Sequence, residues 1–266
     1  MLCRCFPLRT VYTRGNRKIQ YTILMIRIAV IGAGNVGSHL AKALRMPRAI
    51  EAGAETIAVN PRTLDGLPSD ADLYLICVKD DAIASVADSL PQVEGIVAHT
   101  SGSVDIGILS RHKRRGVFYP LQTFTKGVNL DYRQIPFFIE GSDEEVCRRL
   151  CGYASLISDT VKRAGSATRA RLHLAAVFAC NFTNCLYGIA DDILKESGLD
   201  FKVLLPLIDQ SVAKVADVSP RCAQTGPAAR GDLRVMSKQE AMLASHSDYQ
   251  EIYTLISKYI FNLYNK

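Results

Sequence analysis

Residues 26–37 have the sequence Ile-Arg-Ile-Ala-Val-Ile-Gly-Ala-Gly-Asn-Val-Gly. The β-branched first half predicts a short buried strand, and the glycine cluster predicts a tight turn directly after it. A helix is predicted next, over residues 36–45. A strand, a G-x-G-x-x-G turn and a helix in this order are typical of the dinucleotide-binding unit of a Rossmann fold. We therefore predict a nucleotide site here, the alternative being a purely structural turn.

The three glycines of this turn have separate expected tasks. Gly32 permits the tight turn, Gly34 lets the backbone approach a pyrophosphate, and Gly37 lets the helix pack closely on the strand. The pyrophosphate is expected at the helix N-terminus, where free N–H groups and the helix dipole favour an anion. The predicted phosphate-binding loop consists of Gly32, Ala33, Gly34, Asn35, Val36 and Gly37.

The rest of the first half of the chain contains further short apolar runs. Strands are predicted at 56–60, 73–78, 96–100, 117–119, 136–139 and 156–161, with a helix at 82–90. Most of these runs lack alternation of apolar and polar residues, which indicates strands buried on both faces, as in a parallel sheet covered by helices.

After about residue 163 the pattern becomes helical. Helices are predicted over 166–197, over 200–215 with a bend at Pro206, and twice within 233–264, with a Pro/Gly-rich loop at 219–232. The predicted fold class is α/β: a Rossmann-like parallel sheet domain over residues 25–163, followed by a smaller all-helical domain over 164–266. We expect the helical domain to contact the substrate and to form a homodimer.

The charge of the chain is concentrated at its beginning. The 266 residues include 32 Lys and Arg and 26 Asp and Glu, a net charge of +6. Residues 1–24 hold five of the basic residues and no acid, so the remainder is close to neutral. We interpret this extension as a disordered tail or an overlong gene start, rather than a targeting peptide, and predict no nucleic-acid partner.

The cysteines indicate a reducing compartment. None of the eight forms a C-x-x-C pair or a zinc-like cluster with histidine, so we predict no metal site. No apolar run approaches the roughly 18 residues of a membrane span. The expected protein is therefore cytoplasmic, with a small-molecule substrate and no membrane partner.

Residues 60–63, Asn-Pro-Arg-Thr, follow the second predicted strand, where the choice of cofactor is made. NAD-binding proteins usually have Asp or Glu there to accept a hydrogen bond from the ribose 2′-hydroxyl. Arg62 can instead bind a 2′-phosphate, with hydrogen bonds from Asn60 and Thr63. We therefore predict NADP rather than NAD; the alternative is a solvated arginine in a loop.

The ends of the later strands are expected beside the nicotinamide, because ligands bind at the carboxyl ends of parallel strands. These ends are polar or rich in glycine, as many ordinary loops are. The candidates for cofactor contacts are Val78, Lys79, Asp80 and Thr100. The candidates for orienting a substrate are Ser101 and Gln122.

The long predicted helix carries a narrow polar strip on an apolar body. At about 100° per residue, His173, Asn181 and Asn184 fall within one arc. His173 is our first candidate for acid–base chemistry, because an unperturbed histidine titrates near neutrality. Asn181 would orient the substrate. The alternative is a set of satisfied polar groups at a helix or dimer contact.

Residues 225–232, Thr-Gly-Pro-Ala-Ala-Arg-Gly-Asp, place one arginine in a constrained backbone. Arg230 could hold an anionic group of the substrate. The alternative is a connector with an internal Arg–Asp pair.

Five of these segments together resemble a family of bacterial Rossmann-fold proteins, commonly named NADP oxidoreductases, with a C-terminal domain of unknown function. They are GAGNVG at 32–37, HTSGS at 99–103, YPLQTF at 119–124, the helix from His173 to Asn184, and TGPAARGD at 225–232. The resemblance spans about residues 25–264. More distantly, the chain is similar to the superfamily of 6-phosphogluconate dehydrogenase and pyrroline-5-carboxylate reductase. It implies a dimerising helical domain and an active cleft between the domains.

The chain departs from the superfamily at two positions. The sugar-acid dehydrogenases of the superfamily have a catalytic lysine on the first long helix. In this chain the first lysine of that helix is Lys195, near the C-terminal end of the helix. Similar sequences also often have histidine at the position of Tyr119. Our first hypothesis is an enzyme that moves hydride between NADPH and a small carbonyl or imine substrate. The second is a non-catalytic NADP(H) sensor.

Overall fold

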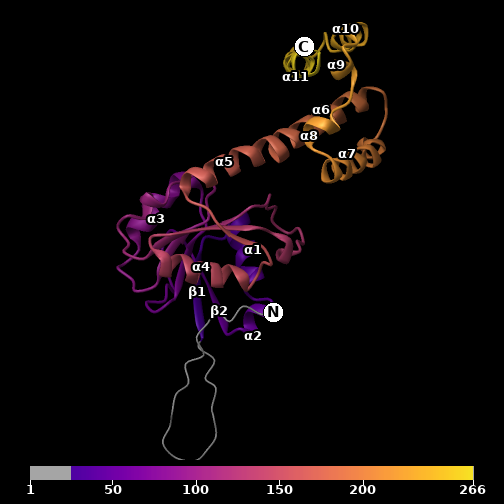
Figure 1. The fold of residues 1–266 in the computed structure, drawn as a ribbon. Helices are drawn as coiled ribbons and strands as arrows, with labels where there is room; N and C mark the ends of the chain where they lie inside the picture. Colours follow the sequence, from indigo (N-terminus) through magenta and orange to yellow (C-terminus); the bar gives the residue numbers. More distant parts are fainter. Residues whose placement is uncertain (1–24, 266) are drawn as a thin grey trace, which may run out of the picture. The chain divides into compact units, whose positions relative to one another are not determined.

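The computed structural model describes residues 25–265 and divides into two compact units, one up to Cys180 and one from Asn181. Figure 1 follows the chain through the first unit, in indigo to salmon, and the second, in orange and yellow. The predicted extension, residues 1–24, lies outside the described residues. The first unit ends later than the predicted boundary at residue 163, because the following helix is anchored to the sheet by Arg169, which is completely buried.

The first unit contains a seven-stranded sheet in the order β2-β1-β3-β4-β5-β6-β7. The strands are β1 (Ile26–Ile31), β2 (Ala54–Val59), β3 (Leu73–Ile76), β4 (Ile96–His99), β5 (Arg115–Pro120), β6 (Phe137–Gly141) and β7 (Val161–Arg163). The first five pair in parallel, which confirms the Rossmann-like α/β fold.

The sheet is not wholly parallel, since β6 runs antiparallel to β5. The connection between these two strands contains only the short 3-10 turn Tyr132–Gln134, and antiparallel neighbours need no crossover helix. The strand predicted at 156–161 was also misplaced. Residues 156–158 are buried in a turn, where Ser158 Oγ donates to the Ile135 carbonyl over 2.6 Å, and β7 begins only at Val161.

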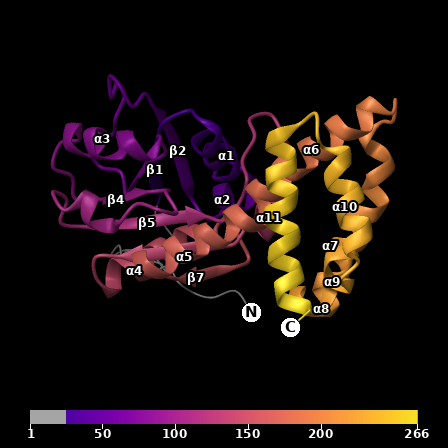
Figure 2. The same ribbon diagram turned by 90° about the horizontal axis from the view of Figure 1, so that it is seen from above.

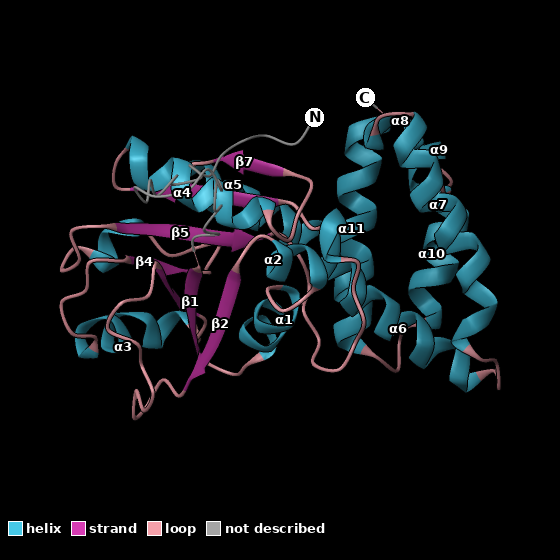
Figure 3. Ribbon diagram, turned by 90° about the horizontal axis from the view of Figure 1, so that it is seen from below, coloured by secondary structure: helices cyan, strands magenta, loops and turns pink. Residues whose placement is uncertain are grey.

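Helices cover both faces of the sheet. The helices α1 (Asn35–Ala43), α2 (Pro47–Glu51) and α4 (Glu144–Ser155) contribute to one core, and α3 (Ile83–Ser89) to the other. Successive residues of β1 alternate between the two cores, as the twofold period of a strand requires. Figures 2 and 3 show α3 and α4 on opposite sides of the strands. The apolar runs in the sequence therefore correspond to strands buried on both sides.

The predicted helix over 166–197 is present as α5 (Ser166–Ala176), a π-helical segment (Val177–Phe182) and α6 (Thr183–Glu196). By length and composition alone, it could also cross a membrane, and it is the one helix of residues 25–265 that could. Core helices of other proteins pass the same test, so this finding is weak evidence for a membrane span.

The second unit is helical. After the 3-10 turn Phe201–Leu204, its helices are α7 (Leu205–Asp217), α8 (Pro220–Ala223), α9 (Pro227–Arg230), α10 (Leu233–Met242) and α11 (Ser247–Tyr264). Pro206 lies in the first turn of α7 and does not bend a helix as predicted, because proline fits the first turn of a helix. The predicted loop 219–232 holds the two short helices α8 and α9, each of which begins with a proline.

Candidate functional site

The glycine turn after β1 has the geometry that a nucleotide-binding loop requires. Gly32 has a φ of +115°, and a Cβ there would lie 2.5 Å from the backbone oxygen of Cys77. A Cβ at Gly37 would overlap the backbone oxygen of Gly32. At Gly34, in contrast, a Cβ would meet nothing within 4 Å. Two of the glycines are thus needed for internal packing, and the third leaves an open approach to the backbone.

The N-terminus of α1 is suited to an anion. Gly34 is its N-cap and provides no side chain to bind the first N–H groups of the helix. The first turn of α1 contains no acidic residue. The first N–H groups of any helix lack partners within it, and the helix dipole adds a partial positive charge there. The residues present therefore fit the pyrophosphate of a dinucleotide.

The loop after β2 presents Arg62 to solvent. The Asn60 side-chain oxygen accepts a hydrogen bond from the Arg62 backbone N–H over 2.9 Å, which forms a local turn. Thr63 Oγ1 accepts from the Asp65 backbone N–H over 3.4 Å. Within residues 25–265, the guanidinium of Arg62 takes part in no ion pair, although it is exposed. The group is therefore available to an anionic ligand.

The loops after β3 and β4 are joined by a hydrogen-bonded chain. Ser103 Oγ donates to the Asp80 carboxylate over 2.5 Å, and Ser101 Oγ accepts from the backbone N–H groups of Ser103 and Val104, both over 3.2 Å. Thr100 Oγ1 donates to the Ile76 carbonyl over 3.5 Å. Asp80 and Ser101, predicted separately, thus belong to one network at the carboxyl edge of the parallel strands.

Two further predicted positions flank this network. Val78 lies next to the glycine turn, since a Cβ added at Gly32 would lie 3.3 Å from Val78 Cγ1. Lys79 is exposed at the start of the 3-10 turn Asp80–Ala82.

His99, the last residue of β4, holds the same loop by a hydrogen bond. It is completely buried, and its Nδ1 accepts a hydrogen bond from the Ser101 backbone N–H over 3.2 Å. Burial, and next the nearby positive charge of Arg169, lower the pKa of His99 to about 4. The imidazole is therefore neutral at physiological pH. Its role is to fix the backbone of the loop.

Tyr119, at the end of β5, contacts His173 on α5. The phenol oxygen lies 3.2 Å from His173 Nδ1, and the two rings meet edge to face with their centres 6.2 Å apart. Gly102 makes room for the pair, because a Cβ there would lie 2.7 Å from Tyr119 Cζ and 2.9 Å from His173 Nδ1. Burial raises the pKa of Tyr119, so the phenol stays protonated at physiological pH.

A buried ion pair fixes the start of α5. The side chain of Arg169 is completely buried and pairs with Glu140, whose side chain is 18% exposed. Arg169 also donates to the Val104 carbonyl and, over 3.2 Å, to Ser166 Oγ. Arg169 and His173 are four residues apart and therefore lie on the same face of the helix. The ion pair thus holds the helix face that presents His173 to Tyr119.

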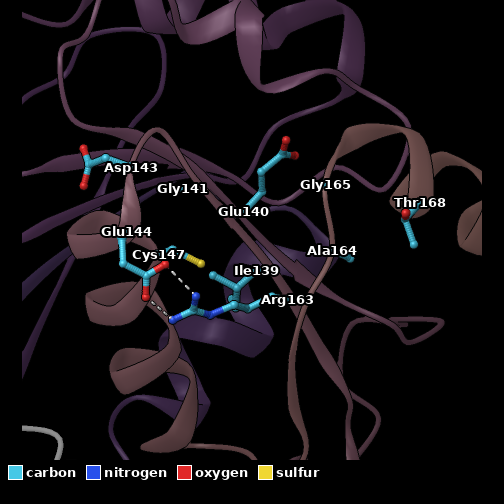
Figure 4. A pocket seen from close by; sticks show the side chains of 10 residues that line it. All are labelled: Ile139, Glu140, Gly141, Asp143, Glu144, Cys147, Arg163, Ala164, Gly165 and Thr168. Atoms are coloured by element: carbon cyan, nitrogen blue, oxygen red, sulfur yellow. Dashed lines mark hydrogen bonds and ion pairs between the residues drawn. The ribbon is translucent and has the colours of Figure 1, made fainter.

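A cavity of about 450 Å³ lies between the ends of β6, β7 and α4 (Figure 4). In it, the Arg163 guanidinium binds both carboxylate oxygens of Glu144, over 2.7 and 2.8 Å. Glu140 lines this cavity, but Tyr119 and His173 do not. The cavity is therefore separate from the contact between Tyr119 and His173.

The remaining predicted residues, Gln122, Asn181 and Arg230, are all exposed. Gln122 is exposed, and its side-chain oxygen accepts from the Thr123 backbone N–H over 2.8 Å. Asn181 and Arg230 are exposed in the second unit, so their part in a common site stays a prediction. The alternative of an internal Arg–Asp pair is not supported, because the Asp232 carboxylate caps α10 by accepting from the Val235 N–H.

Tyr119, Gly102, Arg169 and Glu140 were not among the predicted site residues. One signal for Arg169 was present in the sequence: a charged residue four positions before His173, on a helix rich in apolar residues. Glu140 follows the apolar run of β6, where its partner could not be known without the fold. The pairing of Tyr119 with His173 joins positions 54 residues apart.

The family described as Domain of unknown function (DUF2520) matches residues 135–260. No protein of curated function matches the chain. Among solved structures, the 1-pyrroline-5-carboxylate reductase of Streptococcus pyogenes shares 12% identity, covers 90% of this chain and 99% of its own, and has a TM-score of 0.56. A reductive aminase from Aspergillus terreus, in complex with NADPH and ethyl levulinate, shares 13% identity over 82% of this chain and 78% of its own, with a TM-score of 0.54. Both show the fold alone.

A structure from Bacteroides fragilis, described as a “putative NADP oxidoreductase”, is much more similar. It shares 37% identity, covers 91% of this chain and 100% of its own, and has a TM-score of 0.78. Similarity of this extent, over almost the whole of both chains, is family-level similarity. The chain therefore belongs to the same family as the Bacteroides fragilis protein, a family of Rossmann-fold oxidoreductases with a C-terminal domain of unknown function.

Proposed function

We propose that this chain uses NADP(H) to reduce the C=O or C=N group of a small substrate. One observation carries the proposal: the carboxyl edge of the parallel strands holds both the open glycine turn and a protonated donor, the Tyr119–His173 pair. A cofactor extended along this edge would bring its nicotinamide near the loops after β3, β4 and β5. The reduction needs a hydride at carbon and a proton at the heteroatom.

NADPH, when bound, supplies the hydride. The residues of the chain would bind and orient the reactants and provide the proton. Residues 32–37 hold the pyrophosphate, and the network of Asp80 and Ser101 borders the place where the substrate meets the nicotinamide. His173 provides acid chemistry, and Arg230 holds an anionic substrate group.

NADP is preferred over NAD because of the loop after β2. Residues 60–63 contain no carboxylate that would repel a 2′-phosphate. The Arg62 guanidinium is exposed and takes part in no ion pair within the part of the chain that the structure describes. A guanidinium offers two parallel N–H donors to a phosphate. The similar fold of a reductive aminase that binds NADPH supports the same choice.

The cofactor preference is tested by Arg62→Asp, with NADPH and NADH affinities measured by calorimetry. The variant should shift the preference by about 1.5–3 kcal/mol toward NADH, the range for hydrogen bonds to charged groups. That corresponds to roughly 10- to 150-fold in the affinity ratio. The control is Lys113→Asp, which makes the same charge change at an exposed residue. Lys113 precedes β5 and so lies at the amino ends of the parallel strands, away from the loop after β2. An unchanged affinity ratio for Arg62→Asp would contradict the assignment.

Turnover is tested by following NADPH oxidation with a panel of cyclic imines, ketones, aldehydes and 2-oxo acids. We expect oxidation with at least one class. NADPH binding without oxidation across the panel would instead favour the non-catalytic sensor.

A further inference from the structure

We propose that Tyr119 delivers the proton to the substrate heteroatom and that His173 returns a proton to Tyr119. This inference rests on the proposed reduction and makes it more specific. It predicts a substrate whose heteroatom must be protonated, a carbonyl or a neutral imine, rather than an iminium ion.

The geometry of the pair fits a proton relay. The phenol oxygen and His173 Nδ1 are 3.2 Å apart, within the reach of a proton transfer. Tyr119 lies at the carboxyl end of β5, beside the loop after β4, whereas His173 lies on α5. The tyrosine therefore belongs to the edge where the cofactor is expected, and the half-buried histidine contacts it from α5.

Gly102 shows that the two groups are packed for contact. No other residue type fits at this position without displacing both rings, because a Cβ would lie within 3 Å of each. The pair is also held from the helix side, since Arg169 anchors the same helix face to Glu140. The contact is thus maintained by residues on three separate segments.

The proton and electron balance is complete with NADPH as the reductant. Hydride adds to the substrate carbon, and the electron pair of the C=O or C=N bond moves to the heteroatom. The Tyr119 O–H bond breaks as its proton moves to that atom. The phenolate takes the proton from Nδ1–H of His173, and the imidazole takes a proton from water in return.

The decisive variant is Tyr119→Phe, which keeps the ring and removes the hydroxyl. It should slow reduction of a carbonyl substrate by about 10²-fold or more, because the general acid is lost. An N-methylated cyclic iminium ion needs no proton on nitrogen, so its reduction should change less than 3-fold. NADPH affinity, measured by calorimetry, should stay within 2-fold of wild type. Equal losses with both substrates, or no loss with the carbonyl, would overturn the inference.

The role of His173 is tested by chemical rescue. His173→Ala should slow carbonyl reduction by about 10²-fold, and added imidazole should restore at least one tenth of the lost rate. Gly102→Ala should slow the same reaction, whereas Gly165→Ala, whose Cβ comes no closer than 3.7 Å to a Glu140 oxygen, should not. Absence of rescue in a folded His173→Ala variant would refute the relay.

The proposed function and this inference fail in different ways. Absence of turnover with every substrate in the wild-type protein removes the reduction, and the relay with it. Normal wild-type turnover with an active Tyr119→Phe variant removes only the relay.

Discussion

The buried ion pair between Arg169 and Glu140 allows a quantitative prediction for stability. The Glu140→Gln change removes the carboxylate and leaves a completely buried guanidinium without a counter-charge. Breaking a buried pair in this way typically costs about 3–5 kcal/mol. We expect the lower end, about 3 kcal/mol, because the amide oxygen can still accept a hydrogen bond and the bonds of Arg169 to Val104 and Ser166 remain.

The loss of unfolding free energy in Glu140→Gln can be measured by thermal unfolding. For a domain of this size, 1 kcal/mol shifts Tm by about 2–4 °C, so a shift of roughly 6–12 °C is expected. Far-UV circular dichroism is a suitable probe because the chain has no tryptophan. Hydrogen exchange of the α5 amides should also accelerate, since the pair anchors this helix.

The chain provides a matched control in Glu144→Gln. Glu144 also pairs with an arginine, Arg163, but the two side chains are 76% and 51% exposed. An exposed pair is worth about 0–1 kcal/mol, so Tm should fall by less than about 4 °C. Equal shifts for Glu140→Gln and Glu144→Gln would refute the argument that burial makes the first pair the anchor of α5.

Three further predictions concern other parts of the molecule. Because the pKa of buried His99 is lowered to about 4, the unfolded chain binds a proton between pH 6.5 and 4 that the folded chain does not. Over this pH range, the free energy of unfolding in urea titrations should fall by about 3 kcal/mol more for the wild type than for His99→Asn. Parallel curves of unfolding free energy against pH for the two proteins would count against this. Gly34→Ala should weaken NADPH binding and leave Tm unchanged, whereas Gly37→Ala should lower Tm through overpacking of about 1–3 kcal/mol; the reverse pattern would exclude our reading of the turn. We also expect a homodimer formed by the C-terminal helices, because large apolar side chains such as Leu207 and Leu255 are 65% and 71% exposed. Replacing both with lysine should give a monomer in sedimentation equilibrium, and a wild type that is itself monomeric at micromolar concentration would end this proposal.

The fold could be predicted where the local pattern reports burial directly. The runs at 26–31 and 73–78 are almost wholly apolar, with Arg27 as their one charged residue, and the structure shows strands at both places, with β3 ending at Ile76. The orientation of β6 could not be predicted, because it depends on how the connection from β5 folds. That connection closes on itself, with the Leu121 N–H bonded to the Pro136 carbonyl over 2.8 Å, and no local signal specifies this contact.

The candidate site was only partly accessible from the sequence, for a similar reason. The glycine turn is local, so its motif and its flanking strand and helix could be recognised together. His173 was accessible because helical periodicity places polar residues on one face. Tyr119 was noticed only as part of the YPLQTF motif, and its contact was not accessible, since only the fold brings a histidine to 3.2 Å from its hydroxyl. The chemistry of single motifs was thus predictable, and the contacts between distant segments were not.

The contacts that the sequence did not predict all lie within the first unit. The glycine turn, Tyr119 and His173 all belong to the first unit, and the Arg169–Glu140 pair holds the helix face of His173 within it. The residues that we propose for pyrophosphate binding and for proton delivery therefore all lie within the first unit. Asn181 and Arg230 belong to the second unit, and we expect them to act on which substrate binds.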